Sequence, residues 1–289
     1  MTEKRWPEIV RARRPRRGSG ARQTIVLGVP GGFSCIYTGL EDMPYKGGNE
    51  YDRYMGRWSR RLAPLFLDFA GVDGVDRVLD VGCGTGSLTD AIVTVSKASR
   101  IVGIDPVQDF VRYARVSVTD PRVRFTEGSA QRLPFPDSDF DACLSLLVIH
   151  NISDPAQAVR EMCRVTRPGG LVAACEWDFH SGMDMFRVVW DALVDVDPSA
   201  APKHIRHTPY GDRGQIAQLW EDGGIEDVEE SSLTIPLNFA SFDDFWAPFP
   251  DSPSTAVTHV RKLPPEARQR FHTQLKTALF SGEDDGPIT

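Results

Sequence analysis

Short runs of consecutive apolar residues alternate with amphipathic segments through the middle of the chain, between residues 50 and 180. The apolar runs have the length and composition of buried strands. The segments between them carry apolar residues at helical spacing and end near glycine or proline. We therefore expect an α/β domain with a mostly parallel sheet. Its strands are expected at 77–81, 100–105, 122–126, 140–149 and 171–177.

The remainder of the chain has a looser pattern, in which helical spacing dominates. An aromatic-dense segment lies at 239–246 and is expected to form a turn or a short helix. The other predicted elements are helices at 50–70, 183–194, 212–222 and 264–280 and a strand at 225–237.

The first strand runs directly into a glycine turn. Asp80 closes the strand, and Gly82, Gly84 and Gly86 follow at every second position. A dinucleotide-binding turn has the spacing G-x-G-x-x-G or G-x-G-x-x-A, which this turn does not match. An acid just before the turn suits a ligand with an ammonium group better than a pyrophosphate. Asp105, at the end of the next strand, is placed to accept hydrogen bonds from both hydroxyls of a ribose.

These residues resemble the cofactor site of the class I S-adenosylmethionine (SAM) methyltransferases, in the group that includes ubiquinone/menaquinone-type and natural-product C- and O-methyltransferases. The match extends over residues 50–180. It implies SAM as the cofactor and a Rossmann-like fold with helices on both faces of the sheet. The family has an acid before alanine in the loop preceding the fourth strand, where this chain has Ser129, so backbone groups are expected to contact the adenine instead. Arg57 is expected to pair with the SAM carboxylate. The expected cofactor-binding residues are Tyr51, Arg57, Asp80, Gly82, Cys83, Gly84, Asp105, Pro106, Ser129, Ala130, Gln131 and Leu146.

Methyl transfer from a sulfonium depends mainly on aligning the acceptor atom, the methyl carbon and the sulfur. His150 is the titratable side chain at the tip of the fourth strand, and we expect it to be the catalytic base if the acceptor must lose a proton. The alternative is a structural role in which it holds a backbone carbonyl. We expect no metal site, because the six histidines are scattered and the five cysteines form no C-x-x-C pair.

In this fold the elements after the fifth strand build the substrate wall. Their aromatic and apolar residues predict a small, apolar or aromatic organic acceptor, methylated by in-line displacement. Ordinary core packing is the alternative for each of them. A SAM-binding protein without activity and an NAD(P)-dependent oxidoreductase also remain open as functions. The predicted wall residues are Trp177, Phe179, Met183, Met185, Phe186, Phe242, Phe245 and Trp246.

The charge is unevenly distributed. The net charge is −7, but residues 1–22 hold eight Lys/Arg against two Glu, so the rest carries −13. An acidic body argues against a nucleic-acid partner, and the Asp/Asn-Pro-Pro-aromatic motif of DNA and RNA amino-methyltransferases is absent after the fourth strand. A nucleic-acid methyltransferase that uses the Arg-rich arm is the weaker alternative. No apolar run is long enough for a membrane span, and the cysteine pattern fits a reducing cytoplasm. A monomer and a homodimer are both compatible with the sequence.

Two expectations concern the ends of the chain. Residues 1–42 are rich in Arg, Pro and Gly without an apolar period, so we predict a disordered, dispensable basic extension. The methyltransferase domain is expected at 43–289, with a core at 50–180 and lid and substrate-wall elements at 181–289. The family's last strand runs antiparallel between the fifth and sixth, and here it is expected to be cut short, which would leave unpaired edges.

Overall fold

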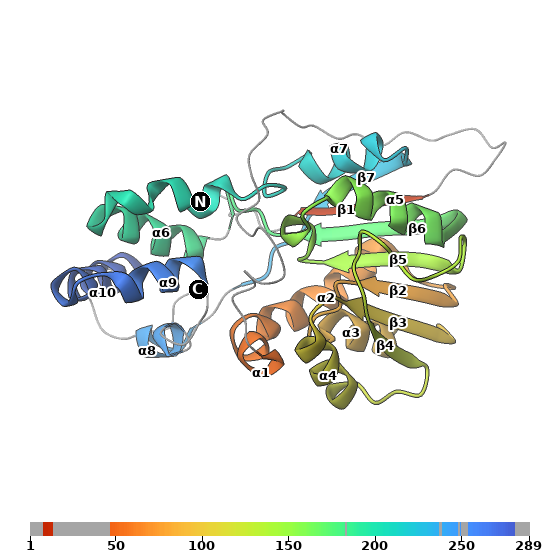
Figure 1. The fold of residues 1–289 in the computed structure, drawn as a ribbon, viewed down its shortest axis with the longest axis horizontal. Coiled ribbons are helices and arrows are strands. Elements are labelled where there is room, and N and C mark those ends of the chain that lie inside the picture. Colours follow the sequence, from red (N-terminus) through yellow and green to blue (C-terminus); the bar gives the residue numbers. More distant parts are fainter. Residues whose placement is uncertain are drawn as a thin grey trace.

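A computed structural model describes residues 8–13, 47–182, 184–236, 239–247, 249 and 254–280. One sheet of seven strands forms the centre of the fold, in the order β4-β3-β2-β5-β6-β1-β7 (Figure 1). In chain order the strands are β1 (Glu8–Arg13), β2 (Arg77–Val81), β3 (Arg100–Asp105), β4 (Val123–Glu127), β5 (Phe140–Leu146), β6 (Thr166–Glu176) and β7 (Glu226–Ser232).

The neighbouring strands from β4 to β6 pair in parallel, which confirms the predicted sheet. Alternate residues of each strand face two separate hydrophobic layers, because strand side chains point to opposite faces. Val78 and Ile101 face α2, α3 and α4, whereas Leu79 and Val102 face α5 and α7. Helices therefore cover both faces, as expected. The covering helices are α2 (Arg57–Ala70), α3 (Ser87–Val95), α4 (Gln108–Ser117), α5 (Pro155–Val165) and α7 (Gln215–Asp222).

The prediction of a disordered extension is wrong for residues 8–13. They form β1, which pairs antiparallel with β6 on one side and with β7 on the other. Glu8 lies opposite Glu176 in one ladder and opposite Ser232 in the other. The prediction rested on side-chain composition, whereas strand pairing uses the backbone N–H and C=O groups that nearly every residue carries. The rest of the predicted extension lies outside the described residues.

The expectation of unpaired edges beside the fifth and sixth parallel strands is also wrong. The antiparallel position between the fifth and sixth parallel strands, β6 and β7, is occupied by β1. The position expected for a strand at the end of the sequence is thus filled by a segment from its beginning. The truncated last strand that we expected at 281–289 lies outside the described part of the chain.

The remaining helices gather beyond the ends of the parallel strands. The first helical segment after β1 in the described part of the chain is α1 (Gly48–Tyr51), followed by a π-helical segment (Asp52–Gly56) that continues into α2. Helices α6, α9 and α10 pack together, and α8 packs on α10, on the left of Figure 1. This group is the helical lid, made of α6 (Asp184–Val196), α8 (Phe242–Trp246), α9 (Thr255–Lys262) and α10 (Pro265–Phe280). Three short 3₁₀ helices lie at 149–151, 198–203 and 205–207.

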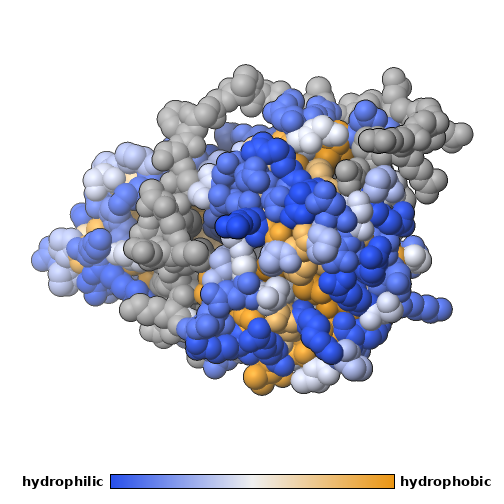
Figure 2. Space-filling model, turned by 45° about the vertical axis from the view of Figure 1, so that its right-hand side comes forward, coloured by the Kyte–Doolittle hydropathy of each residue, from blue (hydrophilic) through white to orange (hydrophobic). Residues whose placement is uncertain are grey.

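The surface seen in Figure 2 is largely hydrophilic, with hydrophobic residues showing between the charged ones. Within the described ranges, no helix combines the length and the apolar character that a membrane crossing requires.

Candidate functional site

The glycine turn leaves β2 in a backbone conformation that side chains disfavour. Gly82 and Gly84 have φ values of 72° and 51°. A Cβ on Gly82 would lie 2.4 Å from Val148 Cγ1, so the close approach of the two segments also requires glycine there. Around Gly84 only Tyr51 Cε1 comes near, at 3.9 Å from the position of a Cβ. The turn thus leaves open space beside Gly84, and the Tyr51 ring lies on the far side of that space.

Asp105 is fastened to this turn by backbone hydrogen bonds. The Gly84 N–H donates to Oδ2 at 3.0 Å, and the Val107 N–H donates to Oδ1 at 2.8 Å. Burial raises the pKa of this carboxyl to about 6, although the two N–H donors oppose the rise. Each oxygen has accepted one hydrogen bond and keeps a second lone pair. The carboxylate can therefore accept from two hydroxyls while its position stays fixed.

Asp80 is more deeply buried, with 1% of its surface exposed. Its Oδ2 accepts a hydrogen bond from the Thr89 hydroxyl at 2.6 Å. Its Oδ1 is buried and has no hydrogen-bond partner among the residues that the structure describes. Burial raises the pKa of Asp80 to about 7, with the Thr89 hydroxyl acting in the opposite direction and Asp105 adding to the rise. A buried acceptor without a donor is costly, so this oxygen suits a ligand that brings a cationic N–H.

Tyr51 closes the site from the side of α1. Its ring packs against Phe110 with the centroids 5.1 Å apart. Burial raises the pKa of the Tyr51 phenol, and the charges of Asp105 and Glu176 raise it further. The phenol therefore stays neutral, and it lies within electrostatic range of carboxylates from two different strands.

The ends of β5 and β6 form the opposite side of the site. Leu146 ends β5, and Leu147 follows with a φ of 63°, which is unusual for a branched side chain and typical of strained functional turns. His150 Nδ1 lies 2.8 Å from Glu176 Oε2, and Glu176 is fully buried. The contact is close but off the direction of a regular hydrogen bond. The His150 ring also packs edge-on against Phe179 at 5.1 Å.

Glu176 is held in turn by backbone donors. Its Oε1 accepts from the Trp177 N–H at 2.9 Å, and its Oε2 accepts from the His150 N–H at 3.3 Å. The carboxylate thus fixes one ring nitrogen of His150 and leaves Nε2 outside this contact. Such a pair can orient an imidazole and stabilise it when it gains a proton.

The loop predicted to contact the adenine, residues 129–131, is held by one internal hydrogen bond and by hydrogen bonds from Ser153 and Gln157. Ser129 Oγ accepts from the Gln131 N–H at 3.2 Å, and Gln131 Oε1 accepts from the Ser153 hydroxyl at 2.9 Å. The role of Ser129, Ala130 and Gln131 at an adenine stays a prediction.

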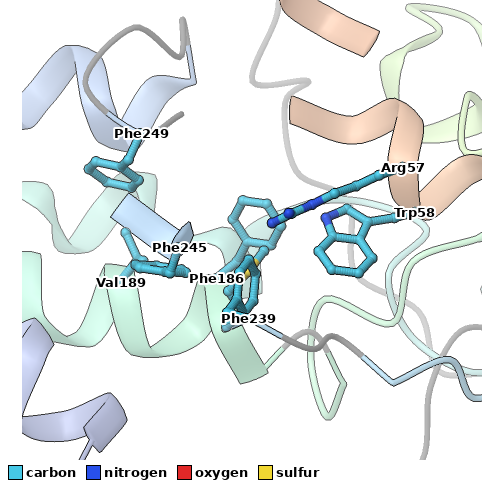
Figure 3. Close-up of a pocket in the computed structure, with 8 residues that line it drawn as sticks. Arg57, Trp58, Phe186, Val189, Phe239, Phe245 and Phe249 are labelled. Atoms are coloured by element: carbon cyan, nitrogen blue, oxygen red, sulfur yellow. The ribbon is translucent and has the colours of Figure 1, made fainter. Parts of the chain in front are cut away.

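Cys83, Pro106 and Arg57 were also predicted to bind the cofactor, and they lie in three different places. The Cys83 side chain is buried in the hydrophobic layer, so its contribution to the turn is the backbone N–H that donates to the Ile104 carbonyl. Pro106 directly follows Asp105 at the end of β3. Arg57 does not contact the turn in the described structure. It lines a separate cavity with Trp58 and aromatic residues of the lid (Figure 3).

Sequence reasoning missed two residues that shape the site. Thr89 was an unmarked position in a predicted helix, although its place nine residues after Asp80 puts it on the first turn of α3, beside the strand end. Glu176 belonged to a strand interpreted as scaffold. A charged residue at the end of an otherwise apolar run was the available signal, because full burial of a carboxylate requires partners.

Several known proteins similar to this chain are described as methyltransferases. A family described as "Methyltransferase domain" matches residues 79–174. A demethylmenaquinone methyltransferase of Renibacterium salmoninarum is 31% identical over 61% of this chain and 77% of that protein. A probable S-adenosylmethionine-dependent methyltransferase of Mycolicibacterium smegmatis is 36% identical over 60% of this chain and 61% of its own length. An uncharacterized methyltransferase of Schizosaccharomyces pombe is 34% identical over 38% of this chain, and the match spans less than half of that protein, 43%.

Proposed function

The chain belongs to the SAM-dependent methyltransferases, and from this premise we propose that it methylates a small organic acceptor with an aromatic or apolar body. The observation that carries the proposal is the pairing of two sites. One is the glycine turn with its two buried carboxylates, and the other is a lid cavity lined largely by aromatic side chains.

The carboxylates fit the two ends of the cofactor. Asp80 Oδ1, buried without a donor in the described part of the chain, suits the ammonium of the methionine portion. Asp105 suits the ribose hydroxyls, since each of its oxygens still has an unused lone pair. When bound, SAM supplies a methyl group on a sulfonium that is already electrophilic.

We assign the handling of the acceptor proton to His150. Bound SAM would supply the methyl carbon to the acceptor atom, and its sulfur would keep the electron pair of the broken carbon–sulfur bond. A proton that the acceptor loses passes to His150 Nε2, while Glu176 stabilises the resulting imidazolium through Nδ1. The residues themselves otherwise orient the reactants and exclude water.

The names of several relatives favour a ring-carbon acceptor. Proteins from Renibacterium salmoninarum and Roseiflexus castenholzii that match this chain are named demethylmenaquinone methyltransferases. We therefore keep methylation of a quinol ring carbon as a specific candidate within the proposed class.

Two measurements test the proposal. Calorimetry with SAM and with NAD should detect binding of SAM alone. Incubation with methyl-labelled SAM and a small-molecule extract should then transfer label to an organic compound, identified by mass spectrometry. Binding of NAD in preference to SAM would favour an oxidoreductase. Tight SAM binding without label transfer to any extract or to reduced quinones would favour a SAM-binding protein without activity.

A further inference from the structure

A cavity lined by eight described residues lies between α2 and the helical lid. Seven of the residues that line it are apolar or aromatic, among them Trp58, Phe186, Phe239 and Phe245. The eighth is Arg57, and Figure 3 shows its guanidinium extending from α2 toward the phenyl rings of the lid. Arg57 is thus the one charged residue among the eight that line the cavity.

The neighbours of Arg57 satisfy it only in part. Its guanidinium carbon lies 4.3 Å from the Trp58 ring centroid and 4.7 Å from that of Phe239. These stacking contacts leave the in-plane N–H donors unused. The nearest carboxylate in the described structure, Asp244, is 3.7 Å from Nη1 and its side chain is 42% exposed. The Nε–H is buried and makes no hydrogen bond within the described ranges.

The local charge is not balanced either. Arg61 lies on the same helix, and its guanidinium carbon is 5.3 Å from the Trp58 ring centroid. Two cations therefore contact one indole ring, and the ion pair that Arg57 makes within the described ranges is with Asp244 at 3.7 Å. Burial lowers the pKa of Arg57, and repulsion from Arg61 lowers it further, against the attraction of Asp244. The cavity thus combines aromatic walls with an arginine whose side chain is 33% exposed and whose described carboxylate partner, Asp244, is 3.7 Å away.

We infer that the cavity binds the methyl acceptor as an aromatic anion, whose acidic oxygen pairs with Arg57 while its ring packs among Trp58, Phe239 and Phe245. This inference rests on the proposed function, because it takes the cavity as the acceptor site. It assigns Arg57 to specificity for the acceptor rather than to the SAM carboxylate. Arg57 lies against two rings that meet edge-on, with their centroids 5.5 Å apart. Its planar guanidinium offers parallel N–H donors that match a carboxylate, a sulfonate or a phenolate.

A matched pair of fluorescent probes tests the charge separately from the ring. The aromatic anion 8-anilinonaphthalene-1-sulfonate and the neutral N-phenyl-1-naphthylamine share one ring system and differ by the sulfonate. Both are titrated into the full chain in the presence of S-adenosylhomocysteine. We expect Arg57→Met to weaken binding of the anion at least about 10-fold, as loss of a hydrogen bond to a charged group does. Binding of the neutral probe should change less than about 2-fold.

Arg61→Met is the matched control. It removes an equal charge from the same helix and the same indole, but Arg61 does not line the cavity and donates instead to the Pro236 carbonyl. We expect it to change binding of the anion no more than about 3-fold, and Arg57→Lys to fall between the parent and Arg57→Met. Circular dichroism and the S-adenosylhomocysteine affinity of each variant report on folding. If Arg57→Met misfolds, Arg57→Gln replaces it.

Equal effects of Arg57→Met on the two probes, or equal effects of the two arginine variants on the anion, would overturn the inference. Either result can occur while SAM binding and label transfer remain intact, so failure here is distinguishable from failure of the proposed function. Loss of SAM binding in the parent would instead count against the proposed function itself.

Discussion

The two halves of the site are built from the chain in different ways. The glycine turn, Asp80 and Asp105 come from one stretch of fewer than 30 residues, in which two adjacent parallel strands end side by side. The lid cavity and the far edge of the sheet are assembled from segments that lie far apart in the sequence. In the proposed function the first half binds the cofactor and the second selects the acceptor, and the second also includes the strand β1 that lies between β6 and β7.

The largest expected effect tests the remote half. Deleting residues 1–13 should expose the facing edges of β6 and β7, which pair with β1 in the described sheet. Because each backbone hydrogen bond contributes about 0.5–1.5 kcal/mol, we expect a loss of at least about 3 kcal/mol, or roughly 6 °C or more in Tm. Thermal unfolding followed by circular dichroism measures this effect.

A point substitution tests whether the effect of the deletion comes from lost strand pairing or from the shorter chain. Val10→Pro removes a ladder N–H from a strand paired on both sides, whereas Val10→Ala keeps that N–H. The proline variant should approach the deletion and the alanine variant should stay near the parent. An unchanged Tm after deletion would restore the view that the N-terminal segment is dispensable.

The next effect tests the local half. Asp105→Ala should weaken SAM binding at least about 100-fold, since it removes a charged acceptor for two hydroxyls. Calorimetry with SAM measures the change, and Glu127→Ala, at the end of neighbouring β4, is the control carboxylate. A parent-like affinity in Asp105→Ala would contradict the assignment of the glycine turn as the cofactor site.

A smaller effect is expected at His150, the proposed base. His150→Ala should lower kcat about 100-fold, the lower range for loss of a positioned base, while leaving the SAM affinity within about 3-fold. Glu176→Gln should lower kcat less, because it weakens the orientation of His150 without removing it. The comparison needs an acceptor found by label transfer. A kcat near that of the parent in His150→Ala would support the structural role of this histidine.

The smallest expected effect is a dependence on pH. SAM should bind to the ionised forms of Asp80 and Asp105, whose pKa values are raised to about 7 and 6. We expect the affinity to fall about 10-fold between pH 8 and pH 6 as Asp80 takes up a proton, and more steeply below pH 6. Calorimetry across this range measures the slope, and Asp80→Asn should flatten it between pH 8 and pH 6.

The stability of the free protein should respond in the opposite direction. Both pKa values are raised above those of an unfolded chain, so between about pH 4 and pH 7 the folded state binds more protons. The contribution of these two groups to stability therefore decreases as pH rises. If SAM affinity and free-protein stability changed in the same direction over this range, the carboxylates would not be the groups responsible.

The sequence could predict the local half because spacing along the chain carries it. Asp80 and Asp105 end neighbouring strands, so their distance in the chain implies their proximity in space. The partnership of Glu176 with His150 depends on a parallel pair of strands joined by a long crossover, and no spacing rule reveals it. Arg57 lies one helical turn and a half from Tyr51, close enough in sequence to be assigned to the cofactor, yet it faces the lid.

The position of β1 was hidden for a different reason. A central strand paired on both edges can be built from a charged segment, because its register is set by two backbone ladders. The composition of residues 1–42 indicates only that they are polar and charged. It cannot indicate that a strand position between β6 and β7 is open, because those strands lie far along the chain.

That strand also imposes an order on biosynthesis. Glu8 leaves the ribosome about 220 residues before Ser232, its partner in β7. At roughly 5–20 residues per second the nascent segment waits about 10–45 s for the second of its ladders. Until then the outer edge of β1 lacks its partner strand, and any other extended chain can pair with it. The yield of active enzyme should thus depend on how quickly translation proceeds and on which chaperones shield the growing polypeptide.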